Sequence, residues 1–407
     1  MYQLLITKRN GRVVSSLFQE QRLVQVQVEP SEEETIVGNI YVGKVQNIVR
    51  NINAAFVQIQ EDTICYLSLN EPGTPIFLNK KNTSKVCVGD ELLVQVSKDA
   101  VKTKNPSATT KLQIAGKYAV LTYGDKRISI SGKIKEPKTR KRLHDLVEQE
   151  FGTKITCGVI VRTNAENVAE EDFLRELRNL KNRYDTIVGQ GLYRTRYSLL
   201  YEAPRGYLCD IRDGYDKLIS KIITDDVEIY EQVSQYLENN QPSDLHKLEL
   251  YEDEMLSLNQ LYGIETKLQK ALQERVWLKS GGYLIIEPTE ALTVIDVNTG
   301  KAIAGKKDSE EHFLKINMEA ANEIAAQLRL RNISGIILVD FIDMKDKKSD
   351  QILIEELKRV IRLDPVKTVF VDMTGLHLAE ITRKKVRRPL HEQIAMCDKK
   401  QNRNKRN

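Results

Sequence analysis

The fold of this chain is decided by a stretch that begins YLIIEPTEALTVIDVN (283–298) and ends GIILVDFIDM (335–344). Its opening part holds two short apolar runs separated by Pro288-Thr-Glu290, a pattern that predicts two strands joined by a hairpin. Apolar residues then recur at helical spacing from Leu314 to Leu328. The continuous apolar run Ile336–Val339 is typical of a strand buried on both faces. The stretch therefore predicts strand, turn, strand, helix and strand.

Two of these predicted strands end in acidic residues. The second strand ends in Asp296-Val-Asn298, and alternation along a strand places Asp296 and Asn298 on the same side. The last strand runs directly into Asp340, so neighbouring strands would each deliver an aspartate. Carboxylates brought together repel and are costly to bury unpaired, and a hard divalent cation is their natural partner. The residues alone predict a Mg²⁺ site, while a turn or cap role for each aspartate stays open.

Three segments of the stretch resemble the signature of the ribonuclease E/G family. They are EALTVIDVNTG (290–300), NEIAAQLRLR (322–331) and GIILVDFIDM (335–344). The resemblance implies that Asp296 and Asp340 hold a catalytic Mg²⁺ and that Asn298 orients Asp296. It further implies an endoribonuclease that cleaves single-stranded RNA, is stimulated by a 5′-monophosphate, and leaves 5′-phosphate and 3′-hydroxyl ends.

The resemblance also implies a multidomain α/β and α+β fold. The expected domains are an RNase H-like domain in two parts (1–34 and 206–278), an S1 RNA-binding barrel of the OB-fold type (35–110), a 5′-sensor domain (111–205), a DNase I-like catalytic domain (279–395) and a basic tail (396–407). The residues themselves support the barrel, because short strands follow one another closely from about Ile36 to Val96 with no helical pattern between them.

Residues expected to bind single-stranded RNA lie in and after this barrel. Aromatic rings on a barrel face can stack on bases, and the resemblance gives this role to Phe56 and Tyr66. On alternation alone, Phe56 could equally belong to the barrel core. Lys104 lies in the basic segment 98–111 and matches an RNA-contacting lysine of the family. A run of lysines can also be a solvated face without a ligand.

A phosphate pocket is expected at the end of the predicted strand Gly158–Thr163. A guanidinium fork matches phosphate oxygens, and a helix start adds free N–H groups, here from a helix predicted between about Val168 and Tyr184. The resemblance implies that Arg162 and Thr163 bind the 5′-monophosphate of RNA. Gly116, in a predicted strand reaching Leu121, matches a glycine that lines the pocket. A third contact, near Gly132 or Lys133, is left unassigned.

The C-terminal part departs from the family pattern. The segment Ala379–Arg388 carries five basic residues and matches a family segment expected to face RNA. Cys397-Asp-Lys-Lys400 stands where the family has a pair of cysteines that binds a shared zinc between subunits. One thiolate per chain cannot complete a Cys₄ site, so no structural Zn²⁺ is expected. A monomer, or a homodimer formed by another route, stays open.

Composition sets wider limits on class and location. The chain has 407 residues, enough for roughly two to four domains, and a net charge of only +5, which alone does not indicate nucleic acid. No apolar run reaches the ~18 residues of a membrane helix, and the N-terminus shows no secretory signal. Five scattered cysteines suit a reducing cytoplasm, where the protein is expected.

The expected partner is single-stranded RNA, in rRNA processing from precursors and in mRNA decay, with no membrane partner. The alternative is a non-catalytic RNA-binding factor that keeps the fold and acts in ribosome assembly. A protein that has lost catalysis tends to lose its charged metal ligands first. Because Asp296, Asn298 and Asp340 are all present, the sequence favours the enzyme.

Overall fold

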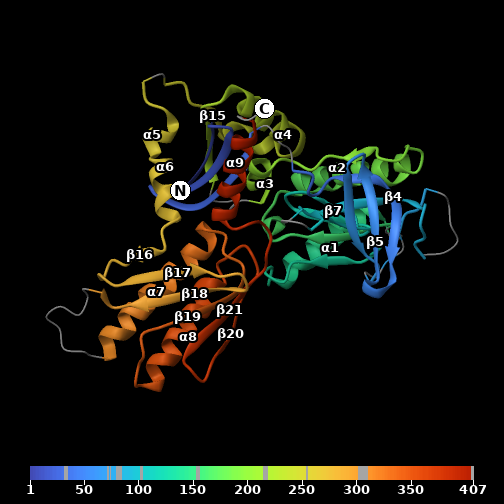
Figure 1. Ribbon diagram of the computed structural model, residues 1–407. Coiled ribbons are helices and arrows are strands. Elements are labelled where there is room, and N and C mark those ends of the chain that lie inside the picture. Colours follow the sequence, from blue (N-terminus) through green and yellow to red (C-terminus); the bar gives the residue numbers. More distant parts are fainter. Residues whose placement is uncertain are drawn as a thin grey trace. The chain divides into compact units, whose positions relative to one another are not determined.

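The computed structural model describes residues 1–31, 35–70, 73, 75–78, 85–100, 104–152, 156–213, 219–253, 255–300 and 310–404, with side chains described as far as Asp398. The chain divides into two compact units, which are drawn in Figure 1. Met1–Glu32, Lys217–Ser234 and Asp244–Asn407 form the terminal unit, and Glu33–Asp216 with Gln235–Ser243 form the inserted unit. The inserted unit thus interrupts the terminal unit in sequence.

The first sheet of the terminal unit contains strands from before and after the inserted residues 33–216. Its strands are β1 (Tyr2–Arg9), β2 (Arg12–Gln19), β3 (Arg22–Pro30), β14 (Ile219–Thr224) and β15 (Leu248–Leu250), in the order β15-β14-β1-β2-β3. β1 is antiparallel to β2 and parallel to β14. Helices α5 (Leu258–Tyr262), α6 (Ile264–Ala271) and α9 (Leu390–Asn404) share its apolar core. The N-terminal strand β1 thus pairs with β14, which lies in the segment 206–278 that was expected to share a domain with residues 1–34.

The second sheet of the terminal unit contains the stretch that decides the fold. Its strands are β16 (Arg275–Trp277), β17 (Tyr283–Pro288), β18 (Leu292–Asn298), β19 (Gly335–Asp340), β20 (Thr368–Met373) and β21 (Leu378–Arg383), in the order β16-β17-β18-β19-β21-β20 (Figure 1). Helix α7 (Glu310–Leu330) connects the parallel strands β18 and β19, and α8 (Lys347–Ile361) follows β19. The predicted order of strand, hairpin, strand, helix and strand is confirmed.

The prediction that residues 336–339 are buried on both faces is wrong. Ile337 and Val339 are fully buried in the core that α7 and α8 share with the sheet, but Ile336 is 50% exposed. The two helices pack on one face only, so the side chains that alternate to the other face stay accessible. We call this second side the open face of the sheet.

The inserted unit begins with a closed barrel. Its strands are β4 (Ile40–Val49), β5 (Ala54–Gln60), β6 (Thr63–Ser68), β7 (Glu91–Lys98) and β8 (Ser107–Thr109), and pairing of β4 with β7 closes the circle. β13 (Leu199–Tyr201) adds to β4 at one edge. The barrel core is apolar and includes Val57, Ile59 and Leu67. The predicted small barrel is confirmed, and the chain as a whole is a mixed α/β protein.

A four-stranded sheet follows the barrel in the inserted unit. Its order is β11 (Ile128–Ile130), β12 (Gly158–Val161), β10 (Ala119–Thr122) and β9 (Gln113–Ala115). Helices α1 (Pro137–Phe151) and α2 (Glu170–Gly191) share its core, and α3 (Gly206–Asp213) comes later. The strand predicted from Gly116 to Leu121 is instead a turn leading into β10, because the chain reverses between the antiparallel strands β9 and β10.

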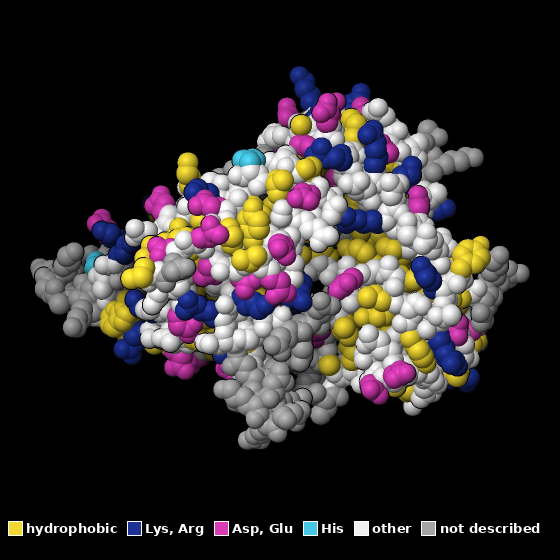
Figure 2. All heavy atoms as spheres, turned by 90° about the horizontal axis from the view of Figure 1, so that it is seen from above, with side chains coloured by type: hydrophobic (Ala, Val, Ile, Leu, Met, Phe, Trp, Pro, Cys, Tyr) yellow, Lys and Arg dark blue, Asp and Glu magenta, His cyan; other side chains and the backbone are white. Residues whose placement is uncertain are grey.

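No helix among the described residues is long and apolar enough to cross a membrane. On the face drawn in Figure 2, lysine and arginine side chains lie among aspartate and glutamate side chains. This distribution agrees with a near balance of 62 basic and 57 acidic residues. Any affinity for nucleic acid must therefore arise from particular residues rather than from the net charge.

Candidate functional site

Asp296 and Asp340 are direct neighbours across two parallel strands. They are register partners in the pairing of β18 with β19, and each lies at or near the C-terminal end of its strand. Both are exposed on the open face, since the adjacent Ile295, Val297 and Val339 point into the core. Paired strands lie about 4.8 Å apart, so the two carboxylates project side by side. The structure brings together the two aspartates that the sequence singled out.

Asn298 is the third residue of this group. Its Nδ2 donates a hydrogen bond of 2.7 Å to Oδ2 of Asp296, which fixes the orientation of that carboxylate. Burial raises the pKa of Asp340, and the nearby charges of Asp296 and Asp343 raise it further. A divalent cation would relieve this repulsion, and carboxylate and amide oxygens are the ligands that Mg²⁺ prefers. The residues present therefore fit a hard metal ion.

Arg162 is held on one edge of its guanidinium by two acceptors. Its Nη1 donates to the carbonyl oxygen of Gly116 at 2.7 Å and to Oδ1 of Asp213 at 2.6 Å. Arg212 also donates to Asp213, through Nε and Nη2, so two guanidinium groups share one carboxylate. The Arg162 side chain remains 27% exposed. Two of the predicted phosphate-binding residues, Arg162 and Gly116, are therefore in direct contact.

Thr163 lies beside Arg162 but not at the start of a long helix. It begins the short 3-10 turn Thr163–Ala165, and α2 starts only at Glu170. The helix expected from about Val168 begins at Glu170, where the acidic residues Glu170, Glu171 and Asp172 favour a helix start. A contribution of its N–H groups to phosphate binding stays a prediction. The Thr163 hydroxyl shares a 2.8 Å hydrogen bond with Ser131, in the segment where a third contact was left unassigned.

Glu176 is a residue of this region that the sequence analysis missed. Its buried carboxylate accepts hydrogen bonds from the backbone N–H groups of Lys117, Tyr118 and Ala119, at 2.7–2.9 Å. A Cβ atom on Gly116 would lie 2.5 Å from Oε1 of Glu176, so a larger residue at this turn would force the buried carboxylate to move. Glu176 thus fixes the turn that presents the Gly116 carbonyl to Arg162. The available signal was a lone acid on the buried face of α2, between Phe173 and Leu177.

The Asp213 carboxylate gives this network a pH dependence. Burial by itself would raise the pKa of Asp213, but hydrogen bonds and charges from Arg212 and Arg162 outweigh burial and lower the pKa to about 2. Since the pKa is about 3.9 in an unfolded chain, the ionised group stabilises the fold above about pH 4. That stabilisation, on the order of 1–2 kcal/mol for a partly exposed group, is lost as the pH falls from about 4 to 2.

We therefore expect Asp213→Asn to lower the Tm at pH 6 and to have little effect at pH 2. The measurement is thermal unfolding of the parent and the variant across this pH range. A Tm difference of the same size at every pH would contradict the assigned role of the Asp213 charge.

Phe56 and Tyr66 lie next to each other on the outside of the barrel. They are register partners on β5 and β6, and their ring centroids are 6.3 Å apart in an edge-to-face arrangement. Both are partly exposed, whereas Ala55 and Val57 point into the core. The alternative that Phe56 belongs to the barrel core is therefore wrong. Lys104 is also exposed, while residues 101–103 before it lie outside the described residues.

Comparison with known proteins identifies the family. A model of the ribonuclease E/G family matches residues 113–386. The chain belongs to the ribonuclease E/G family. It is 34% identical over 376 residues to ribonuclease G of Salmonella typhimurium (strain SL1344), an alignment covering 90% of this chain and 76% of that protein. This membership places the chain among the endoribonucleases, enzymes that act on RNA.

Two further members give similar values. Ribonuclease G of Haemophilus influenzae is 32% identical over 409 residues, covering 97% of this chain and 82% of that protein. Ribonuclease E of Synechocystis sp. is 33% identical over 396 residues, covering 96% of this chain and 58% of that protein. The chain thus spans most of ribonuclease G and somewhat more than half of this ribonuclease E.

The family resemblance overstated the RNA-facing role of the basic segment 379–388. Arg383 is only 4% exposed, and its guanidinium donates to both carboxylate oxygens of Asp364, at 2.7 and 3.3 Å. Its Nη1 donates to Asn332 and to the carbonyl oxygen of Ile333. The expectation is wrong for Arg383 because β21 alternates, which turns this side chain inward. Lys384 and Lys385, after the strand, are exposed.

Cys397 lies within α9 in this member of the family. The thiol is 1% exposed in the apolar core of the first sheet, and burial raises its pKa to about 11. The absence of a structural zinc stays a prediction. The helix continues to Asn404, through much of the segment that was expected to be a tail.

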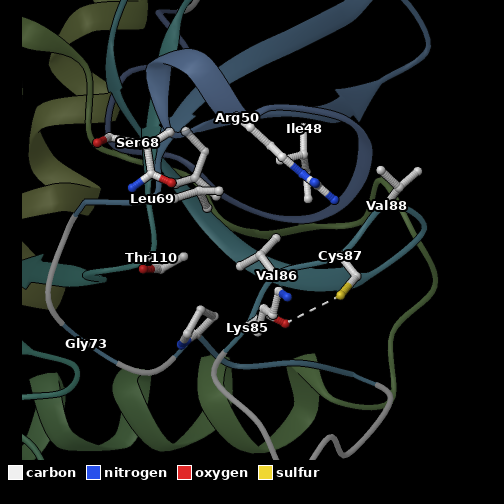
Figure 3. A pocket seen from close by; sticks show the side chains of 13 residues that line it. Ile48, Arg50, Ser68, Leu69, Gly73, Lys85, Val86, Cys87, Val88 and Thr110 are labelled. Carbon is white, nitrogen blue, oxygen red and sulfur yellow. Dashed lines mark hydrogen bonds between the residues drawn. The ribbon is translucent and has the colours of Figure 1, made fainter.

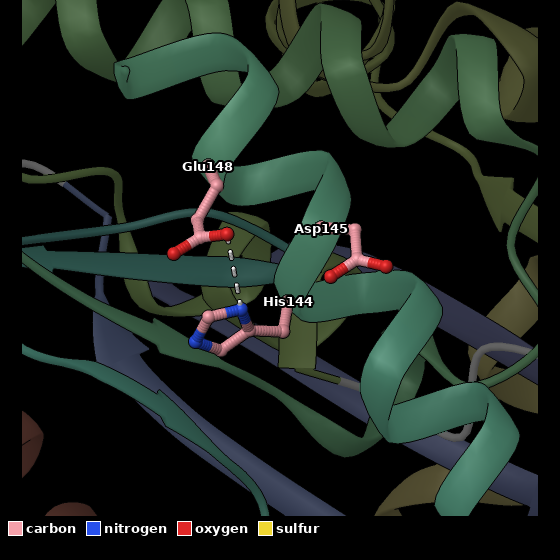
Figure 4. A group of neighbouring side chains, drawn as sticks. All are labelled: His144, Asp145 and Glu148. Carbon is pink, nitrogen blue, oxygen red and sulfur yellow. Dashed lines mark ion pairs between the residues drawn. The ribbon is translucent and has the colours of Figure 1, made fainter. Parts of the chain in front are cut away.

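A second group of possible metal ligands, which no sequence motif indicated, lies on α1. His144, Asp145 and Glu148 have ligand atoms within 4.8 Å of one another, and Nδ1 of His144 is 3.7 Å from Oε2 of Glu148 (Figure 4). Histidine and glutamate four residues apart on a helix face each other as a matter of course. Asp145 and Glu148 are exposed, so solvent already satisfies this group.

The barrel also has a pocket with a volume of about 760 Å³. Figure 3 shows Arg50, Leu69, Val86 and Cys87 among the side chains around it. The ends of β4 and β6 supply other lining residues. Among the described residues that line it, Phe56, Tyr66 and Lys104 do not occur. The pocket and the aromatic pair are therefore separate features of the inserted unit.

Proposed function

We propose that this chain is a Mg²⁺-dependent endoribonuclease that cleaves single-stranded RNA and leaves 5′-phosphate and 3′-hydroxyl ends. The observation that carries the proposal is the registered pair Asp296–Asp340, with Asn298 donating to Asp296, in a member of a ribonuclease family. In this reading the terminal unit holds the RNase H-like and DNase I-like domains. The inserted unit holds the S1 barrel and the 5′-sensor domain.

Asp296 and Asp340 would hold the metal ion. A Mg²⁺ ion held there would supply Lewis-acid polarisation of the scissile phosphate and would lower the pKa of a bound water. Asn298 keeps the Asp296 carboxylate in one orientation through its 2.7 Å hydrogen bond. Because both carboxylates project from the open face, an extended RNA strand can approach them without displacing α7 or α8.

Phe56, Tyr66 and Lys104 would bind single-stranded RNA on the barrel. The edge-to-face rings offer flat surfaces for bases, and stacking on an aromatic ring stabilises a complex by about 1–3 kcal/mol per base. Lys104 would contribute a phosphate contact. Rings on a barrel tolerate many sequences, since every base has a flat face, which suits an enzyme that acts on varied RNAs.

Arg162, Thr163 and Gly116 would form the pocket for a 5′-monophosphate. Nη1 of Arg162 is engaged by Gly116 and Asp213, and among the described residues no acceptor is bound to its Nε or Nη2. These two nitrogens form the flat fork that matches two phosphate oxygens. The Thr163 hydroxyl, held by Ser131, lies next along the chain. The pocket would thus favour RNA that has lost its 5′-triphosphate.

Arg162→Lys is expected to lower kcat/KM about tenfold for 5′-monophosphorylated RNA and to leave cleavage of 5′-hydroxyl RNA unchanged. Lysine keeps the charge but cannot make the two parallel hydrogen bonds of the fork. Arg127→Lys is the matched control, because Arg127 lies in the same unit and its side chain is 82% exposed. Equal losses on the two substrates would show that Arg162 has no sensor role.

The proposed activity is tested by incubating the protein with a 5′-monophosphorylated, AU-rich single-stranded oligonucleotide and Mg²⁺, and then mapping the new ends. Internal cleavage with 5′-phosphate and 3′-hydroxyl ends, abolished by EDTA, is expected. Binding without cleavage would instead favour the non-catalytic RNA-binding factor.

We further propose that the enzyme acts in the cytoplasm, in rRNA processing and mRNA decay, because its scattered cysteines suit a reducing compartment. If it forms a homodimer, it does so without the family's zinc link.

A further inference from the structure

An exposed cluster of aromatic and basic side chains lies on the same sheet as Asp296 and Asp340 and is separate from the residues proposed to hold the metal ion. Arg275 and Trp277 are the two outward residues of β16, and Tyr283 begins β17. The ring centroids of Trp277 and Tyr283 are 5.3 Å apart, inclined at 60°. The Arg275 guanidinium lies 4.6 Å from the Tyr283 ring centroid and 5.7 Å from that of Trp277.

The strand register places this cluster on the open face. Arg275 pairs with Ile285, Ile285 with Asp296, and Asp296 with Asp340. The next row contains Trp277, Tyr283 and Asn298 in register. Leu284, Ile286 and Val276, between these positions, point toward the helices and their core. All three members of the cluster therefore share the side of the sheet from which the aspartates project.

The cluster is close to the aspartates. Neighbouring strands lie about 4.8 Å apart, so the backbone of Trp277 is about 10 Å from that of Asn298, two strands away. Asn298 is in turn hydrogen-bonded to Asp296. Trp277 is therefore within reach of a nucleotide a few positions from a phosphate held at the aspartates.

Exposure and charge indicate what the cluster binds. Trp277 is the only tryptophan of the chain and is 58% exposed, although tryptophan is usually well buried. Tyr283 is already in contact with Arg275, and a Cβ atom added to Gly300 would lie only 3.2 Å from its ring. The accessible indole is thus the surface that a flat ligand would use. Arg275, stacked on the rings, keeps its in-plane N–H groups for a phosphate.

We propose that Trp277, supported by Tyr283 and Arg275, is a base-stacking platform for the RNA strand next to the scissile bond. The inference rests on the proposed function and adds a specificity-determining contact within the catalytic sheet itself. A base stacks on the exposed indole face, and Arg275 binds the adjoining phosphate. Shielding of the short edge strand β16 would not require an aromatic ring that remains more than half exposed.

The first test uses the fluorescence of Trp277, which needs no catalysis. The parent protein is titrated in EDTA with a single-stranded oligonucleotide, and with copies that lack the base at one position at a time. The intact oligonucleotide is expected to quench the tryptophan emission. One of the oligonucleotides that lack a base is expected not to quench it, namely the one that lacks the stacked base. No quenching under saturating RNA, or equal quenching by every oligonucleotide, would overturn the platform.

The second test compares Trp277→Ala with Trp277→Phe in Mg²⁺, after thermal unfolding has confirmed that both variants fold. Trp277→Ala is expected to lower kcat/KM about tenfold, and Trp277→Phe to stay within about threefold of the parent, since a phenyl ring still stacks. The parent should also cleave the oligonucleotide that lacks the stacked base with a lower kcat/KM than the intact one, and in Trp277→Ala this difference in kcat/KM should vanish. Persistence of that difference would overturn the platform.

The two proposals fail separately. Position-specific quenching without RNA cleavage by the parent would support the platform and reject the nuclease. Cleavage without quenching, and with the same kcat/KM in Trp277→Ala as in the parent, would support the nuclease and reject the platform.

Discussion

Asp340→Asn and Asp296→Asn are each expected to reduce kcat for RNA cleavage by at least about 10³-fold while changing RNA affinity little. The two carboxylates are register partners on parallel strands, so each would supply one ligand to a shared cation. An amide keeps the shape of the side chain but removes the negative charge. Loss of several kcal/mol of charge stabilisation in the transition state corresponds to a rate loss of this size. Single-turnover cleavage and RNA binding in EDTA are the two measurements.

Asp372→Asn is the matched control for these variants. Asp372 is an exposed aspartate on β20 of the same sheet, and its Oδ1 accepts a hydrogen bond from the backbone N–H of Met373. This substitution removes the same charge from the same sheet and should leave kcat unchanged. Cleavage by Asp340→Asn at the parent rate, in EDTA as in Mg²⁺, would refute the metal assignment.

Arg383→Met is expected to destabilise the terminal unit by about 3–5 kcal/mol, because it removes the Arg383 charge from beside the buried Asp364 carboxylate. The Arg383 and Asp364 side chains are only 3% and 5% exposed, so water cannot replace the lost partner. The guanidinium also joins Asn332 and Ile333, which precede β19, to β21. Calorimetry of the full chain should show the transition of this unit shifted to lower temperature.

Two further variants separate the buried charge from the loss of packing. Arg383→Met combined with Asp364→Leu removes both charges and should recover much of the lost stability, since apolar replacements of a buried pair are often neutral. Arg359→Met breaks an ion pair with Glu356 in which the arginine is 60% exposed, and should cost less than about 1 kcal/mol. Equal losses from Arg383→Met and Arg359→Met would show that burial is unimportant here.

The sequence predicted best where local pattern and topology coincide. The apolar runs that lead to Asp296 and Asp340 predicted the positions of their two strands. A helix that connects two neighbouring strands of one sheet requires these strands to be parallel. The aspartates could therefore be placed side by side without coordinates. Weak alternation in residues 1–34 indicated only that their strands need a partner elsewhere in the chain. That the partner lies in the segment containing β14 was implied by the family resemblance and not by local pattern.

Residues that act through distant partners could not be found in this way. Asp213 lies 51 positions from Arg162, and Glu176 lies 58 positions from Tyr118, so no local spacing connects either acid to its partner. The burial of Arg383 could not be predicted, because a run of basic residues does not indicate which of its side chains points into the core. The open face was missed as well, since an unbroken apolar run carries no sign of which side a helix will cover.

The interruption of the terminal unit has a consequence for biosynthesis. Ser220 of β14 donates a hydrogen bond to the carbonyl oxygen of Tyr2, 218 positions earlier in the chain. At about 5–20 residues per second, a ribosome needs roughly 10–40 s to deliver this partner after β1 has been made. During that interval β1, β2 and β3 can form only their antiparallel meander, with one edge of β1 unpaired. A nascent chain that stalls within the inserted unit would therefore expose the unpaired backbone N–H and C=O groups of β1 to chaperones and to other nascent chains.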